Sequence, residues 1–76
     1  MTYDLWDVGT GNIINTYDTE YDALRIVREL VNLNGEEYAA ALSLGYEEDD
    51  GSAGIVAEGA ALAALAIGAT QARPAG

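Results

Sequence analysis

The sequence predicts a small α+β domain in which two strand–strand–helix units follow one another along the chain. Three observations predict it: two short strand-like segments around a Gly-rich turn, an amphipathic helical stretch behind a good N-cap, and a second pair of apolar segments leading into an Ala-rich helix. The expected architecture is a two-layer ββαββα fold, with a small antiparallel-rich sheet and two helices on one face. Its two units suggest an internal duplication, although almost no residues match between them.

The first two strands are expected at residues 3–8 and 13–17, because both segments are rich in β-branched and aromatic side chains. Between them stand Gly9, Gly11 and Asn12, which tolerate the positive φ that a tight reversal requires. This part of the chain therefore predicts a β-hairpin.

A helix is expected from Thr19 to Asn34. Thr19 is a favourable N-cap, and Glu20 and Asp22 place negative charge in the first turn, where the helix dipole stabilises it. The apolar side chains that would form the buried stripe are Ala23, Leu24, Val27, Leu30 and Val31. Asn34 and Gly35 predict a left-handed cap at the end of the helix.

The third strand is predicted around Leu42, Leu44 and Tyr46, which recur at a period of two. The preceding segment, residues 36–41, fits either an extended turn or the beginning of a strand. The acidic segment at residues 47–52 predicts a charged turn after the third strand.

The last third of the chain has two interpretations. Residues 53–57 favour a fourth strand because they include Ile55 and Val56, and an Ala-rich helix would then run from Glu58 to about Ala69. The alternative is one longer helix from near Ser52, which would have to accommodate two glycines. We place a single domain at residues 1–70 and expect residues 71–76 to form a flexible tail.

The charge of the chain is strongly negative. Thirteen Asp and Glu residues stand against three Arg and no Lys, for a formal net charge of −10. Nucleic acids and anionic membranes attract basic proteins, so we expect neither as a partner. This charge is compatible with a positive partner, either a basic protein or a metal cation. The alternative is that the negative charge only keeps a small protein soluble. The chain begins without the basic and apolar regions of a signal peptide, and its longest apolar run is too short to span a bilayer, so we expect a cytoplasmic protein.

The composition also argues against catalysis. The chain has no His, Cys or Lys, and therefore lacks the usual proton shuttle, thiolate nucleophile and Schiff-base amine. The acidic run at residues 47–50 does not match a calcium loop, because Ala57 stands where the bidentate Glu would be needed. Gly9 and Gly11 precede a strand rather than a helix, so they do not form a phosphate-binding loop. We expect no enzyme activity, no cofactor and no metal.

Two groups of apolar residues are candidates for interaction. We expect Tyr3, Trp6 and Tyr17 to line one face of the sheet, either as core or as an aromatic patch or pocket for a partner or ligand. The C-terminal helix carries no charge from residue 59 to residue 69, so it is apolar around its whole circumference. Its stripe of Leu62, Leu65 and Ala66 favours self-association, and the alternative is a solvated Ala-rich surface.

Short motifs along most of the chain resemble small, acidic, uncharacterised proteins of high-GC bacteria. They are Tyr3-Asp-Leu-Trp-Asp, Gly11-Asn12, Tyr17-x-Thr19-Glu20, Ala23-Leu24, Leu42-Ser-Leu44 and Ala57-Glu-Gly-Ala-Ala-Leu62. This resemblance implies a bacterial protein and no particular function. The strand–strand–helix opening is also similar to the N-terminal part of HicB-type antitoxins, although this chain has no third strand before its first helix and no DNA-binding tail.

Taken together, these features predict a non-enzymatic protein-interaction module, a homodimer through its C-terminal helix, whose acidic surface meets a basic partner. The alternative is a small regulatory or ligand-binding protein. That class includes an antitoxin-like protein and a nucleic-acid mimic, in which ordered carboxylates take the places of phosphates.

Overall fold

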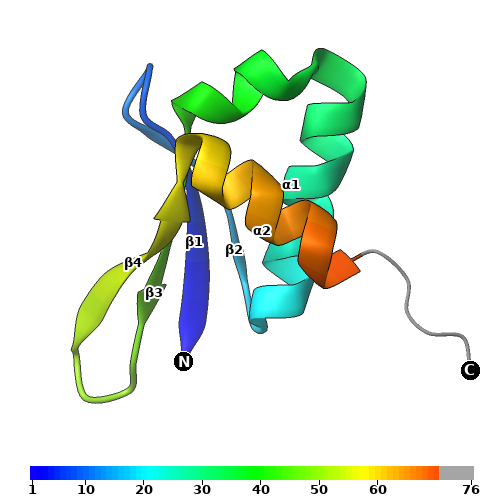
Figure 1. Cartoon of the computed structure of the whole chain (residues 1–76). Helices are drawn as coiled ribbons and strands as arrows, with labels where there is room; N and C mark the ends of the chain where they lie inside the picture. Colours follow the sequence, from blue (N-terminus) through cyan, green and yellow to red (C-terminus); the bar gives the residue numbers. More distant parts are fainter. Residues whose placement is uncertain (71–76) are drawn as a thin grey trace, which may run out of the picture.

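Two β-hairpins form one four-stranded antiparallel sheet, and two helices cover one of its faces (Figure 1). The computed structural model describes residues 1–70, and the predicted tail at residues 71–76 lies outside them. The elements are β1 (Thr2–Asp7), β2 (Asn12–Tyr17), α1 (Glu20–Asn34), the 3₁₀ helix η1 (Glu36–Ala41), β3 (Leu42–Glu47), β4 (Ala53–Glu58) and α2 (Gly59–Thr70). The predicted α+β class and ββαββα order are confirmed.

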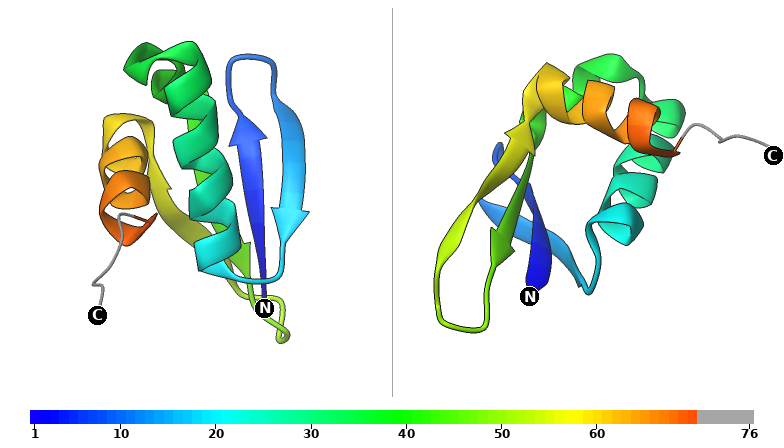
Figure 2. Two further views of the ribbon diagram at one scale, coloured as in Figure 1. Left: turned by 90° about the vertical axis from the view of Figure 1, so that its right-hand side faces the viewer. Right: turned by 60° about the horizontal axis from the view of Figure 1, so that its bottom comes forward.

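The two hairpins meet in the middle of the sheet. The strand order is β2-β1-β3-β4, so the first strand of each hairpin is central and the second is an edge. Leu5 of β1 stands directly opposite Leu44 of β3, and both side chains are fully buried. Figure 2 shows the two layers from the side, with α1 and α2 on the same side of the sheet.

The hydrophobic core lies between the sheet and the two helices. It is made of aliphatic and Ala side chains from every element except β2 and β4: Leu5, Ala23, Leu24, Val27, Val31, Ala39, Leu42, Leu44, Leu62, Ala63 and Ala66. The two edge strands contribute half-buried residues at its margin, among them Tyr17 and Val56.

Helix α1 begins and ends as its sequence predicts. The Thr19 hydroxyl accepts a hydrogen bond from the backbone N–H of Asp22 at 3.1 Å, which satisfies one free donor of the first turn. At the other end Gly35 has a φ of 92°, and its N–H donates to the Val31 carbonyl at 2.7 Å. The predicted stripe faces the core, with four residues buried and Leu30 half-buried.

Two segments that the sequence left open are settled by the structure. Residues 36–41 form neither a turn nor a strand but the 3₁₀ helix η1, in which the small side chain of Ala39 is buried. Residues 53–58 form a strand, as favoured, and not an extension of α2. Gly59 explains the break, because its φ of 62° lies outside the right-handed helical region and separates β4 from α2. Among residues 1–70, no helix is both long and apolar enough to cross a membrane.

The two strand–strand–helix units correspond at a constant offset. Adding 39 to a β1 position gives its counterpart in β3, so that Leu5 corresponds to Leu44 and Trp6 to Gly45. Each hairpin has a β-bulge at the corresponding place, where Ile14 in β2 and Val56 in β4 are the extra residues. The repeat is not evident from the sequence, because few residues are identical between the units, but the corresponding positions of the two bulges show it.

The helices follow the same offset. Ala23, Leu24 and Val27 of α1 are buried, and the positions 39 residues later in α2, Leu62, Ala63 and Ala66, are buried too. The edge strands correspond at an offset of 42. Trp6 and Ile13 are 7 positions apart and their counterparts Gly45 and Ile55 are 10 apart, so the second hairpin is three residues longer between counterparts. The path from the edge strand to the helix is three residues shorter in the second unit, which restores the offset of 39 in α2. The fold therefore has an approximate two-fold axis through the Leu5–Leu44 pair.

Burial of the Leu5–Leu44 pair should make a large contribution to the free energy of unfolding. Replacement of Leu5 by Ala removes a fully buried side chain from the middle of the sheet and should lower the free energy of unfolding by about 2–5 kcal/mol. The matched control is Leu33→Ala, since Leu33 is 81% exposed, and its effect should stay under about 0.5 kcal/mol. Urea unfolding of both variants measures the difference, and equal losses would contradict the assigned core.

Alkaline pH should destabilise the fold through Tyr17. Burial raises the pKa of the Tyr17 phenol above its ordinary 10.0, against a smaller opposing effect of its hydrogen bond with Asn15. A raised folded-state pKa means that the stabilising contribution is complete below pH 10 and is lost as the pH rises through the folded value. Absorbance at 295 nm should show a late-titrating tyrosine that disappears in Tyr17→Phe but persists in a Tyr21→Phe control.

Candidate functional site

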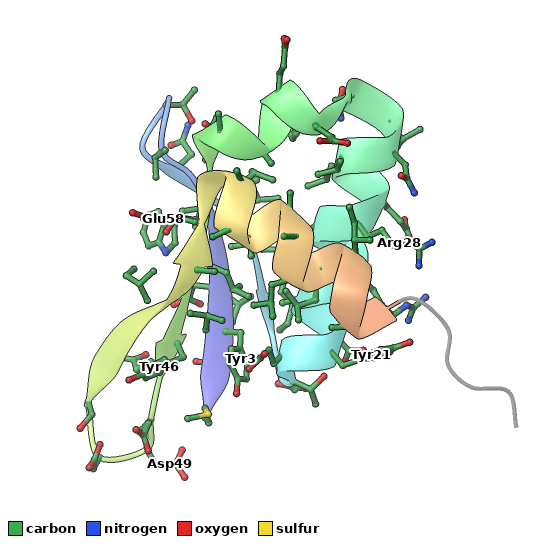
Figure 3. The ribbon with its side chains drawn as sticks, viewed as in Figure 1. Tyr3, Tyr21, Arg28, Tyr46, Asp49 and Glu58 are labelled. Atoms are coloured by element: carbon green, nitrogen blue, oxygen red, sulfur yellow. The ribbon has the colours of Figure 1, made fainter. Side chains whose placement is uncertain are left out.

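The three aromatic residues expected on one face of the sheet lie on opposite faces. Tyr3 is paired with Tyr17, and both pack against the core beneath the helices. Figure 3 shows Tyr3 on that side of β1. Trp6 follows the buried Leu5 in β1, so its side chain points to the other face, and the residue is 39% exposed. The prediction that these three side chains share one face is therefore wrong. Side chains alternate between the two faces along a strand, so residues 3 and 6 point in opposite directions.

We call the face of the sheet away from the helices the open face. Eight side-chain positions in two rows across the four strands define it: Ile13, Trp6, Ser43 and Glu58 in one row, and Thr16, Asp4, Gly45 and Ile55 in the other. Both helices lie on the opposite side of the sheet (Figure 2). Three of its large apolar side chains, Trp6, Ile13 and Ile55, are exposed.

Two hydroxyl–carboxylate hydrogen bonds on the open face each link a central strand to its edge strand. The Thr16 hydroxyl of β2 donates to Asp4 Oδ1 of β1 at 2.8 Å. The Ser43 hydroxyl of β3 donates to Glu58 Oε2 of β4 at 3.2 Å. Asp4 and Ser43 are counterparts at the offset of 39, and Thr16 and Glu58 at the offset of 42. The two units therefore make the same cross-strand contact with donor and acceptor exchanged.

A hollow of about 380 Å³ opens on this face between β1, β3 and β4. Its lining residues are Asp4, Trp6, Gly45, Tyr46, Glu47, Ala53, Gly54 and Ile55. Trp6 and Ile55 supply apolar walls, and the backbone at Gly45 lies between their strands. Since Gly45 is the counterpart of Trp6, the hollow lies where a symmetric face would carry a second indole.

The electrostatic character of the open face is negative. Asp4 and Glu58 belong to it and Glu47 borders it. Arg25 and Arg28, the two arginines within residues 1–70, belong to α1, which lies on the other side of the sheet (Figure 2). Charges of one sign around exposed apolar groups favour a ligand of the opposite sign.

The predicted interface on α2 is corrected by the structure. Leu62 and Ala66 are fully buried in the core, and Leu65 is half-buried against it. These side chains hold α2 to its own chain and are not offered to a second copy. The exposed side of α2 consists of Ala60, Ala61, Ala64, Ile67, Gly68 and Ala69.

Two carboxylates of the acidic turn between β3 and β4 accept hydrogen bonds, one from within the turn and one from the amino group of Met1. Asp50 Oδ1 accepts a hydrogen bond from the Ser52 N–H at 2.9 Å, and this bond lowers the pKa of the Asp50 carboxyl. The Met1 amino group donates to Asp49 Oδ1 at 3.0 Å. A search of residues 1–70 for three or more His, Cys, Asp or Glu side chains placed to hold a metal found none.

Several open-face residues were missed by sequence reasoning. The sequence assigns Ile13 and Ile55 only to strands, gives Gly45 no role, and places Glu47 in the charged turn, whereas the structure has Glu47 as the last residue of β3. The alternation of side chains along β3 could have identified Gly45 and Glu47, because each follows an inward-facing apolar residue, Leu44 or Tyr46, and therefore faces the other side. No sequence signal marks Ile55, because its place beside Trp6 depends on the strand order and on the bulge at Val56.

Comparison of the chain with known protein families, with curated proteins and with solved structures gave no match.

Ionic quenchers should report the charge around Trp6. The chain contains a single Trp, so its fluorescence describes this face alone. We expect cesium to quench Trp6 well and iodide poorly, relative to free N-acetyltryptophanamide, because the surrounding carboxylates repel the anion. Added NaCl should reduce the difference. Equal relative quenching by the two ions, or no quenching by either, would contradict an exposed indole in a negative field.

Proposed function

We propose that this chain is a non-enzymatic interaction module that binds a positively charged segment of a partner protein on its open face. The observation that carries the proposal is the exposed Trp6, with Ile13 beside it and Ile55 across the hollow, on a face that neither helix covers. The proposal moves the expected interface from α2 to the sheet.

Trp6 has the properties of a binding anchor rather than of a core residue. It lies next to the fully buried Leu5 in sequence, yet it points away from the core. Trp is enriched among the residues that dominate the free energy of binding at protein interfaces, because it buries a large apolar area with little loss of side-chain entropy. A single solvent-exposed Trp, paired across the strands with Ile13 at the edge of the hollow, is therefore a candidate anchor.

The carboxylates around Trp6 favour a basic partner over a second copy of this chain. Two open faces placed against each other would bring Asp4, Glu47 and Glu58 of both copies together. Like charges brought together in an interface cost several kcal/mol. A segment with Arg or Lys side chains would instead pair with these carboxylates while its apolar parts cover Trp6.

Self-association through α2 stays a prediction. The exposed side of this helix has small side chains and one larger one, Ile67. Light scattering after size exclusion would measure the mass in solution independently of the open face. The nucleic-acid mimic gains no support, since the acidic turn between β3 and β4 and the acidic residues of η1 lie at opposite ends of the molecule (Figure 1). The antitoxin-like alternative also stays a prediction.

A short fluorescently labelled peptide containing both Arg and Lys is the probe for this proposal. Fluorescence anisotropy should show saturable binding that weakens as NaCl is added, whereas an acidic peptide of equal length should not bind. Trp6→Ala should weaken binding by about tenfold or more, because it removes the anchor.

The matched control is Leu33→Ala, which also removes an exposed apolar side chain but from α1. We expect this variant to bind as the wild type does. Equal affinity of wild type, Trp6→Ala and Leu33→Ala for the basic peptide would show that the open face is not the binding surface, and circular dichroism would establish that each variant is folded.

A further inference from the structure

We infer that the hollow beside Trp6 receives the guanidinium group of an arginine from the partner and selects it over the ammonium group of a lysine. This inference rests on the proposed function and assigns the chemistry of the recognised group. It is carried by the apolar walls and the two carboxylates of the hollow, and by the absence of a side chain at Gly45 between those walls.

Position 45 has no side chain, although the corresponding position of the first unit carries an indole, and Gly45 itself is buried. Gly45 stands at the position of Trp6 in the second unit, directly opposite Asp4 and Ile55. A Cβ at Gly45 would lie 3.1 Å from the Gly54 carbonyl oxygen and 3.8 Å from Ile55 Cδ1. The first distance is tighter than ordinary contact with a rigid backbone atom, so position 45 does not admit a side chain. The second distance is ordinary van der Waals contact, so the Ile55 side chain lies over Gly45, and the hollow is bounded by Trp6 and Ile55 rather than by open backbone.

The walls suit a flat cation. Trp6 and Ile55 come from β1 and β4 on the two sides of Gly45, so the hollow has an aromatic side and an aliphatic side. A guanidinium group is planar and weakly hydrated, and it stacks on aromatic faces. An ammonium group is compact and strongly hydrated, and it would lose more hydration between these walls.

The two carboxylates can satisfy a guanidinium from neighbouring strands. Asp4 on β1 uses Oδ1 to accept the Thr16 hydroxyl, which orients the carboxylate. Glu47 on β3 is exposed and lies two residues beyond Gly45, the cross-strand partner of Asp4. Arg presents five N–H donors in a rigid fork, whereas Lys presents three donors around one point. Contacts to both carboxylates are therefore easier for Arg.

Two peptides of equal length and charge test the inference, one with Arg and one with Lys at every basic position. Anisotropy should give about fivefold or greater tighter binding of the Arg peptide. Trp6→Phe should keep most of this preference, and Trp6→Leu should abolish it, because only the aromatic residue offers a π face. Glu47→Gln should weaken Arg binding more than Glu37→Gln, a control of equal charge change on η1.

A measurement on the unmodified protein avoids variants altogether. The single indole gives one Nε1–H resonance, and the Arg peptide should shift it more than the Lys peptide does at equal saturation. Equal affinities for the two peptides, with both lost in Trp6→Leu, would overturn the arginine inference while leaving the proposed function intact. Failure of both peptides to bind would overturn both.

Discussion

The pairing of β1 with β3 is the interaction on which the rest of the structure depends. It joins two hairpins that would each be marginal alone, since an isolated two-stranded hairpin has no second layer to bury its apolar side. Leu5 and Leu44 stand at the centre of this pairing, and both helices pack over it. The chain has no Cys and no His, so neither a disulfide nor a zinc site can replace this contact.

Adjacent residues of one strand lie in different environments, one in the core and the next on the surface. Leu5 belongs to the core, and Trp6, its neighbour, belongs to the open face. The same alternation holds in β3, where Leu44 is core and Gly45 lines the hollow. Stability and surface chemistry therefore depend on alternate positions, and a substitution at an exposed position of the open face such as Trp6 leaves the core residues unchanged.

The sequence predicts local structure well where a local physical cause exists. The first hairpin and α1 follow from turn residues, an N-cap and a clear apolar stripe, and the structure confirms them. In α2 every position is apolar or small, so no contrast in the sequence separates the buried Leu62 and Ala66 from the exposed side. The short 3₁₀ helix η1 has no periodic pattern of apolar residues from which it could be predicted.

The candidate site depends on non-local facts that sequence reasoning could not supply. Trp6 and Ile55 come together only because β3 lies between β1 and β4 and because a bulge sets the face of Ile55. The grouping of Trp6 with Tyr3 failed for a simpler reason, since three residues along a strand reverse the face. Parity alone would have corrected that prediction.

The approximate two-fold axis has a consequence for the polarity of a bound chain. A symmetric platform presents itself identically to an extended ligand running in either direction, so it cannot distinguish N-to-C from C-to-N. Here the symmetry is broken most strongly at one pair of counterparts, Trp6 and Gly45. For the partner segment proposed above, the direction in which it lies across the sheet would then depend largely on which half of the platform bears the bulky ring and which bears the glycine.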